Sequence, residues 1–320
     1  MTHSLLITRC LPDAIVAEAR KQFDVTYRDR TDVMSAGEMT SALQDYDLIL
    51  PTLGDQFGAD IFAAVDTPRC KLLANFGVGY NHINVAAATA KGIEVTNTPG
   101  AVTDATADTA LTLMLMTCRR AGEGERMVRA GAWQGWHPTQ MLGLHMSGKT
   151  LGVIGMGRIG QAIAKRAHYG FDMNVVFHNR SAKTLDMPAT QLDTLADVMA
   201  ASDVVVIAVP AMPETHHLIN AAALAAMKPT AHLVNIARGD IVEEAALIKA
   251  LQNNQIAGAG LDVYEFEPKV PQALIDMENV TLLPHLGTAA LEVRTNMGEM
   301  ALANLMAFSS GAALPNLVTA

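Results

Sequence analysis

The 320-residue chain has few cysteines: Cys10, Cys70 and Cys118 are far apart in sequence and odd in number. A disulfide framework is therefore not expected, and a reducing cytoplasm fits this cysteine usage best. The chain also lacks any apolar run approaching the roughly 20 residues that cross a bilayer. Residues 1–10 lack the apolar core of a signal peptide and instead indicate a first strand. We therefore expect neither a disulfide-rich secreted domain nor an integral membrane protein.

Charged residues are scarce as well, at 17% of the chain, and acidic residues outnumber basic ones to give a net charge of −9. An acidic surface disfavours nucleic acids and anionic membranes as partners. Because 50% of the residues are hydrophobic, we expect a well-packed globular protein rather than a disordered one. The length suffices for two domains of ordinary size.

The most informative motif lies in Leu151–Gly160, where a short apolar strand leads directly into the pattern G-x-G-x-x-G. A helix-compatible run, Gln161–Ala167, follows. In such a motif Gly155 permits the tight turn, Gly157 lets the backbone approach a pyrophosphate, and Gly160 lets the helix pack closely on the strand. The N–H groups at the start of the helix favour phosphate. The motif residues expected at the cofactor are Gly155, Met156, Gly157, Arg158, Ile159 and Gly160.

The segment after the second strand of this unit indicates which dinucleotide is bound. NAD sites place an acidic residue about 20 positions beyond the glycines, where it binds the ribose 2′-hydroxyl. Here the segment reads Asn179, Arg180, Ser181, with Lys183 beyond, and residues 174–184 contain no carboxylate. A guanidinium can hold a 2′-phosphate through paired charge-assisted hydrogen bonds. We therefore predict that NADPH is preferred and NADH is possible; alternatively, Arg180 and Lys183 are ordinary solvated loop charges.

Short apolar runs alternate with helical patterns along the chain, which predicts parallel sheets flanked by helices. Strands of a first series are expected at Leu5–Thr8, Asp24–Tyr27, Leu48–Pro51, Leu72–Asn75 and Glu94–Thr96. Strands of a second series are expected at Thr150–Ile154, Asn174–Phe177, Val204–Val209, His232–Asn235, Gly258–Asp262 and Val280–Leu283. Helices are expected at Pro12–Gln22, Thr103–Arg120 and Ala289–Ser309, among others. The fold class is therefore α/β with two doubly wound parallel-sheet domains, the second being the Rossmann dinucleotide-binding domain and the first a substrate domain.

Polar side chains follow three strands of the second series, at the edge where open α/β sheets bind ligands. Arg238 follows one strand, Asp262 ends the next with Glu265 and Glu267 shortly after it, and His285 follows the last. Hydride transfer to a 2-oxo acid needs a proton donor at the carbonyl oxygen, for which His285 is the natural candidate. Glu267 would orient the imidazole, and Arg238 would bind the substrate carboxylate and polarise the carbonyl. Taken singly, each of these residues could equally be structural or solvated.

Six ordered motifs make the chain resemble the D-isomer-specific 2-hydroxyacid dehydrogenases over nearly its whole length. The matching segments are Gly77–Asn81, Asn97–Gly100 with Thr103–Asp108, Gly155–Gly160, Asn235–Gly239, Gly260–Pro268 and Pro284–Thr288. The Arg, Glu and His of the family's catalytic triad correspond to Arg238, Glu267 and His285. The motifs are specific to the family but not to a substrate.

The resemblance implies further site residues and a division into domains. Substrate contacts are expected from Leu53, Val78, Gly79, Arg238 and Thr288. Further cofactor contacts are expected from Thr106, Val209, Pro210, Thr215, Ile236, Ala237, Asp262, His285 and Gly287. Residues 1–98 plus 289–320 would form the substrate domain and residues 99–288 the dinucleotide-binding domain, because in this family the C-terminal helix packs back on the first hundred residues. The family is usually homodimeric, with the helix that begins near Thr103 in the contact.

Within the family, the segment Gly131–Trp133 with Trp136, Pro138 and Gly143 resembles the glyoxylate/hydroxypyruvate reductases, in which it can reach a neighbouring active site. That likeness implies reduction of a small 2-oxo acid to the D-2-hydroxy acid, and the pair Asn179-Arg180 matches the NADPH preference usual in that group. Met141 and Leu142 stand where bulky aromatics can occur, so bulkier acids such as phenylpyruvate remain open.

Other functions remain possible from sequence alone. The same fold serves as a cofactor-sensing corepressor that binds peptides, and such a protein can retain the triad. A phosphoglycerate dehydrogenase would often carry a further C-terminal domain, and a formate dehydrogenase of this fold has Gln in place of Glu267. No metal site is predicted, because adjacent His216 and His217 should face different directions and, with His232, lack the spacing of ligands.

Overall fold

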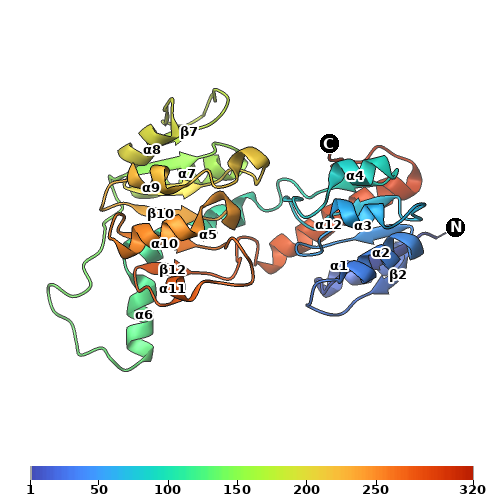
Figure 1. Cartoon of the computed structure of the whole chain (residues 1–320), viewed down its shortest axis with the longest axis horizontal. Helices are drawn as coiled ribbons and strands as arrows, with labels where there is room; N and C mark the ends of the chain where they lie inside the picture. Colours follow the sequence, from blue (N-terminus) through green and yellow to red (C-terminus); the bar gives the residue numbers. More distant parts are fainter. Residues whose placement is uncertain (1, 320) are drawn as a thin grey trace. The chain divides into compact units, whose positions relative to one another are not determined.

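The computed structural model describes residues 2–319, which divide into two compact units. One unit contains the chain up to Val102 together with the chain from Ala289 onward, and the other is Thr103–Thr288 (Figure 1). The predicted α/β class with two parallel sheets is confirmed. Met1 and Ala320, the first and last residues of the expected substrate domain, lie outside the described residues.

The first unit contains a five-stranded parallel sheet in the order β2-β1-β3-β4-β5. Its elements are β1 (Ser4–Ile7), α1 (Asp13–Gln22), β2 (Asp24–Tyr27), α2 (Ala36–Asp45), β3 (Leu48–Leu50), α3 (Ala59–Ala63), β4 (Leu72–Ala74), α4 (Val85–Ala90), β5 (Glu94–Thr96) and α12 (Leu291–Ser310). Helix α12 returns from the far end of the sequence to pack on α1 and β4. Helix α12 packs closely on α1 at Gly298, where a Cβ would lie only 2.5 Å from Cγ1 of Ile15 in α1.

The second unit contains a seven-stranded parallel sheet in the order β12-β11-β10-β9-β6-β7-β8. Its strands are β6 (Thr150–Ile154), β7 (Asn174–His178), β8 (Thr190–Gln191), β9 (Val204–Ile207), β10 (His232–Asn235), β11 (Gly258–Leu261) and β12 (Val280–Leu282). Its helices are α5 (Thr103–Cys118), α6 (Ala121–Arg129), α7 (Arg158–Phe171), α8 (Leu195–Ala201), α9 (Ala221–Ala225), α10 (Glu244–Gln252) and α11 (Gln272–Ile275), with 3-10 turns η1 (Pro213–Thr215) and η2 (Gly239–Ile241). The strand order reverses at β6, which places the ligand crevice of such a sheet at the carboxyl ends of β6 and β9.

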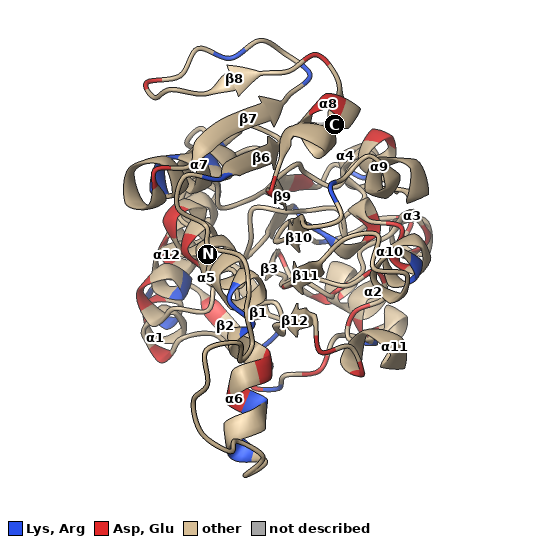
Figure 2. Ribbon diagram, turned by 90° about the vertical axis from the view of Figure 1, so that its left-hand side faces the viewer, with Lys and Arg blue, Asp and Glu red and all other residues tan. Residues whose placement is uncertain are grey.

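Hydrophobic residues cover both faces of this second sheet. Val205 and Leu233 belong to one buried cluster, whereas Val204, Val206 and Val234 belong to another. Because neighbouring residues of a strand point to opposite faces, the alternation shows that helices cover the sheet on both sides. Charged side chains lie on the helices and loops and hardly occur on strands (Figure 2). Within residues 2–319 no helix is long and apolar enough to cross a membrane.

Two elements of the second unit differ clearly from the sequence-based expectation. The first helix of the second unit ends at Cys118 and not at Arg120, because Arg120 has a left-handed backbone (φ 53°) and lies directly before the start of α6 at Ala121. The short edge strand Thr190–Gln191 was not predicted, since two polar residues carry no periodic signal. Helix α6 and residues 130–144 extend away from the sheet of their unit (Figure 1).

Candidate active site

The glycine-rich turn joins β6 to α7 in the way a pyrophosphate site requires. Gly155 has φ +98°, and a Cβ there would lie 2.7 Å from Cγ1 of Val209. A Cβ on Gly160 would lie 2.1 Å from the carbonyl oxygen of Gly155, so the helix touches the turn. Gly157 caps α7, and a Cβ there would meet nothing within 4 Å. The space above Gly157 and the N–H groups of a 14-residue helix thus fit a dinucleotide phosphate.

Asn179 fixes the loop that follows β7 to this turn. Its Oδ1 accepts a hydrogen bond from the Met156 N–H at 3.2 Å, and its Nδ2 donates to the Ser181 carbonyl at 2.9 Å. Arg180 and Ser181 are exposed beside it, and Arg158 is exposed at the start of α7 while Ile159 is half-buried. The loop therefore presents a hydroxyl and a guanidinium, with no carboxylate among residues 174–184.

His285 and Glu267 form a directly bonded pair. His285 Nδ1 lies 2.9 Å from Glu267 Oε2, and the other oxygen of Glu267 accepts the Tyr264 N–H at 3.0 Å. Burial by itself would raise the pKa of Glu267, but the hydrogen bond from His285 and the charges of His285 and Arg238 outweigh it. The pKa of Glu267 therefore lies below its ordinary value, and its carboxylate is ionised at neutral pH. With Nδ1 engaged in this way, Nε2 of His285 is the nitrogen left for substrate.

Arg238 comes from the segment after β10 and shares the electrostatic environment of that pair. Burial lowers the pKa of Arg238, while the charges of Glu267 and Asp240 act in the opposite direction. A guanidinium stays protonated in proteins. Its Nη1 donates to the Ala237 carbonyl at 2.6 Å. The structure thus brings together the three predicted catalytic residues, Arg238, Glu267 and His285, within one unit.

Asp262 at the end of β11 shapes the loop that carries His285. Its carboxylate accepts the N–H groups of Leu286 (2.6 Å) and Gly287 (2.9 Å), and its carbonyl accepts the His285 N–H at 2.9 Å. Burial raises the pKa of Asp262 despite these bonds. Thr106 from α5 donates to the Gly287 carbonyl at 3.1 Å. These bonds hold His285 in a left-handed conformation (φ 57°), which side chains other than glycine rarely adopt.

The remaining expected cofactor residues also follow strands of this sheet. Val209 and Pro210 lie just beyond β9, and the Thr215 hydroxyl donates to the Pro210 carbonyl at 2.8 Å. Beyond β10, Ile236 is buried and the Ala237 N–H donates to Asn235 Oδ1 at 3.0 Å. Thr288, expected at the substrate, ends this unit and is half-buried.

The expected substrate residues of the first unit lie on two loops after neighbouring strands. Leu53 follows β3, while Val78 and Gly79 follow β4, and all three are half-buried. Asn97 Nδ2 donates to the Val78 carbonyl at 2.9 Å, and Asn75 Nδ2 donates to the Gly79 carbonyl at 3.0 Å. Both carbonyls are therefore committed to the protein.

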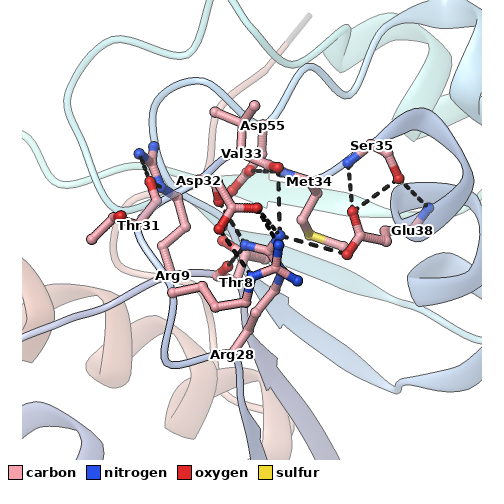
Figure 3. A network of polar contacts seen from close by, with 11 residues as sticks. Thr8, Arg9, Arg28, Thr31, Asp32, Val33, Met34, Ser35, Glu38 and Asp55 are labelled. Atoms are coloured by element: carbon pink, nitrogen blue, oxygen red, sulfur yellow. Dashed lines mark hydrogen bonds and ion pairs between the residues drawn. The ribbon is translucent and has the colours of Figure 1, made fainter.

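Sequence reasoning missed the residues that hold the Leu53 loop. Asp55 is 0% exposed and accepts hydrogen bonds from the Thr8 hydroxyl (2.6 Å) and the Met34 N–H (3.0 Å). Arg9 Nη1 donates to the Leu53 carbonyl at 2.7 Å. Figure 3 shows the contacts of Asp55 with Thr8 and Met34, and the contact of Arg9 with Thr31; Thr8 and Arg9 are the two residues that follow β1. A buried carboxylate needs hydrogen-bond donors such as these, but no local sequence pattern predicts which residues supply them.

The expectation that His216 and His217 face different directions is wrong. Their rings stack with centroids 3.9 Å apart and an interplanar angle of 25°. The cause is the left-handed backbone of His217 (φ 51°), which turns two successive side chains to the same side. His217 Nε2 lies 2.9 Å from Glu265 Oε1.

The glycine turn at the carboxyl edge of the second sheet can thus bind a dinucleotide phosphate. The imidazole of His285 in the same unit can transfer a proton. A nicotinamide-dependent dehydrogenase needs both. The family model described as "D-isomer specific 2-hydroxyacid dehydrogenase, NAD binding domain" matches residues 111–287, and the chain belongs to that family.

Full-length relatives agree with this assignment. The chain is 41% identical to a glyoxylate reductase of Thermococcus kodakarensis, covering 99% of this chain and 96% of the relative. It is 36% identical to a glycerate dehydrogenase of Hyphomicrobium methylovorum, covering 93% of each. Among solved structures, an NADPH-dependent glyoxylate/hydroxypyruvate reductase from Sinorhizobium meliloti, in complex with NADP and malonate, superimposes with a TM-score of 0.89 at 35% identity, covering 100% of this chain and 97% of that one.

Proposed function

We propose that the protein reduces glyoxylate and hydroxypyruvate to the corresponding 2-hydroxy acids, with NADPH as the preferred cofactor. The observation that carries the proposal is the bonded pair His285–Glu267 in one unit with the guanidinium of Arg238. The similar glyoxylate reductases and glycerate dehydrogenase support the choice of small 2-oxo acids.

The reaction adds a hydride to the carbonyl carbon and a proton to the carbonyl oxygen. The reduced nicotinamide, when bound, supplies the hydride. Arg238 pairs with the substrate carboxylate and stabilises the negative charge that grows on the oxygen. His285 donates the proton from Nε2, because Nδ1 is bonded to Glu267. The carboxylate of Glu267 is ionised at neutral pH and orients the imidazole through its hydrogen bond with Nδ1. In the first unit, the N–H groups of Val78 and Gly79 would bind the substrate carboxylate.

The NADPH preference rests on the loop after β7. Arg180 is exposed and can form paired hydrogen bonds with a 2′-phosphate, while Asn179 holds the loop against the glycine turn. A carboxylate at this point would repel that phosphate, and residues 174–184 contain none. The similar reductase from Sinorhizobium meliloti was solved with NADP.

A homodimer is part of the proposal. Val128 of α6 and the two tryptophans of the extended segment are exposed, with Trp133 at 53% and Trp136 at 80%. Large exposed aromatic side chains on a projecting segment are typical of a protein–protein contact. The three free thiols support a reducing compartment, for which we infer the cytoplasm.

A kinetic comparison tests the proposal. With NADPH, kcat/KM for glyoxylate and hydroxypyruvate should exceed that for phenylpyruvate, and NADH should give a higher KM than NADPH. Faster turnover of phenylpyruvate would contradict the substrate class. Absence of turnover with every 2-oxo acid would contradict the catalytic function itself and favour a cofactor-sensing protein.

A further inference from the structure

Three potential metal ligands converge in the second unit without a role in the reaction described above. His216, His217 and Glu265 each offer a ligand atom, and these atoms lie within 4.8 Å of one another. His217 Nε2 and Glu265 Oε1 are 2.9 Å apart, and the ring of His216 stacks on that of His217 at 3.9 Å. Two imidazole nitrogens and one carboxylate oxygen are a donor set typical of zinc and related divalent transition metals.

Backbone hydrogen bonds to the turn η2 hold the segment that carries the two histidines. His217 is held in its left-handed conformation by its N–H, which donates to the Asp240 carbonyl at 2.8 Å. Two residues further on, the Ile219 N–H donates to the Ile241 carbonyl at 3.0 Å. The segment after η1 is thus tied to η2, and the side chain of His217 is directed toward Glu265. The strained backbone persists because these bonds impose it.

Glu265 is oriented from the other side. Its Oε2 accepts the Glu244 N–H at 3.2 Å, which leaves Oε1 to face His217. Metal-binding carboxylates and imidazoles are usually oriented by such secondary hydrogen bonds. The Glu244 carboxylate in turn accepts the Glu265 N–H at 3.4 Å, so the backbone around Glu265 is held as well as its side chain.

We propose that His216, His217 and Glu265 bind a divalent transition-metal ion of the zinc class. A tetrahedral ion with bonds of about 2.0–2.2 Å needs donor atoms roughly 3.3 Å apart, within reach of this cluster. The exposed ring of His216 can close the remaining gap by rotation of its side chain. The ion would take Nε2 of His217 and Oε1 of Glu265 as ligands in place of the hydrogen bond between them, and water would complete the fourth position. The ion ties the turn at 213–217 to the loop 264–267.

Calorimetric titration with Zn²⁺ alone, on the full chain freed of metal with EDTA, tests the site. The wild-type protein should bind one tight ion per chain, and His216→Ala should weaken that binding at least about 100-fold, since loss even of a secondary partner costs about 10–100-fold. Glu265→Gln should weaken it likewise. His145→Ala is the matched control, because His145 is an exposed histidine of the same unit outside the cluster. Co²⁺ should give the visible absorption of a tetrahedral site in wild type and not in His216→Ala.

His285 with Glu267 is a second imidazole–carboxylate pair that could capture zinc. His285→Ala should therefore leave the tight ion in place. Binding that survives His216→Ala and Glu265→Gln at wild-type affinity, or that disappears only in His285→Ala, overturns the proposal. Equal melting temperatures of wild type and variants in EDTA establish that folding is intact, and Zn²⁺ should then raise the melting temperature of wild type and His145→Ala but not of His216→Ala.

Discussion

Gly157 and Gly160 lie three residues apart in one turn, and the structure gives them opposite sensitivities to an added methyl group. A Cβ on Gly157 meets nothing within 4 Å, and its φ of −79° suits any residue. A Cβ on Gly160 would lie 2.1 Å from the Gly155 carbonyl oxygen, so helix α7 must move by about 1 Å or more to reach ordinary contact. The two alanine variants therefore separate a phosphate-binding role from a packing role.

We expect Gly157→Ala to fold normally and to bind NADPH weakly. Alanine is a poorer N-cap than glycine by roughly 0.5–1 kcal/mol, a loss small enough for the protein to remain folded. A methyl group in the space that the pyrophosphate should occupy should weaken binding by roughly 10–100-fold, or about 1.4–2.7 kcal/mol. Gly160→Ala should instead cost about 1–3 kcal/mol of stability through overpacking. In a domain of this size that lowers the melting temperature by roughly 2–12 °C.

Calorimetric titration with NADPH and thermal unfolding without ligand measure the two effects on each variant. Gly157→Ala with wild-type NADPH affinity would show that no phosphate approaches this backbone. Gly160→Ala with wild-type stability would show that the helix does not press on the turn.

Three further predictions concern specificity, pH and catalysis. Arg180→Ala should raise KM for NADPH by about tenfold, a loss of about 1.4 kcal/mol, and leave KM for NADH unchanged; equal effects on both cofactors would contradict a 2′-phosphate contact. Burial lowers the pKa of His232 to about 4, so the folded state resists its protonation. The neutral His232 therefore stabilises the folded state fully at pH values above its ordinary pKa near 6.5, and this stabilisation is lost as the pH falls toward 4. Between pH 7 and 5 the unfolding free energy, measured with urea, should fall by about 2 kcal/mol more in wild type than in His232→Gln. An equal fall in the two proteins would contradict this prediction. Glu267→Gln keeps a hydrogen bond to His285 but removes the negative charge beside the imidazole, so kcat for glyoxylate should fall by about 10–100-fold; a wild-type kcat would exclude a catalytic contribution from the Glu267 charge.

Much of the second unit could be predicted from local sequence. The apolar run Leu151–Ile154 followed by spaced glycines specifies a strand, a turn and a helix start, and the structure contains all three. Arg238, Glu267 and His285 could be grouped because carboxyl ends of parallel strands share one edge of a sheet. Sequence spacing of 29 and 18 residues does not matter once the strands pair.

What could not be predicted depends on contacts between distant segments. Asp55 is buried because Thr8 and the Met34 N–H satisfy its charge, and neither lies in a recognisable pattern with it. The stacking of His216 on His217 depends on one left-handed residue, whose conformation is imposed by the Asp240 carbonyl. Histidine is enriched among non-glycine residues with positive φ, but such residues are only a few per cent of all, so residue type alone does not predict the conformation of His217.

The central claim is that the imidazole of His285, oriented by Glu267, supplies the proton of the reduction. His285→Ala tests it most directly, through kcat with glyoxylate and the Kd of NADPH measured on the same preparation. We expect kcat to fall by about 10²–10⁴-fold with the Kd of NADPH nearly unchanged, because general-acid catalysis is lost while the phosphate site is intact. A kcat within about tenfold of wild type, a barrier change of only about 1.4 kcal/mol, would mean that another group is the acid.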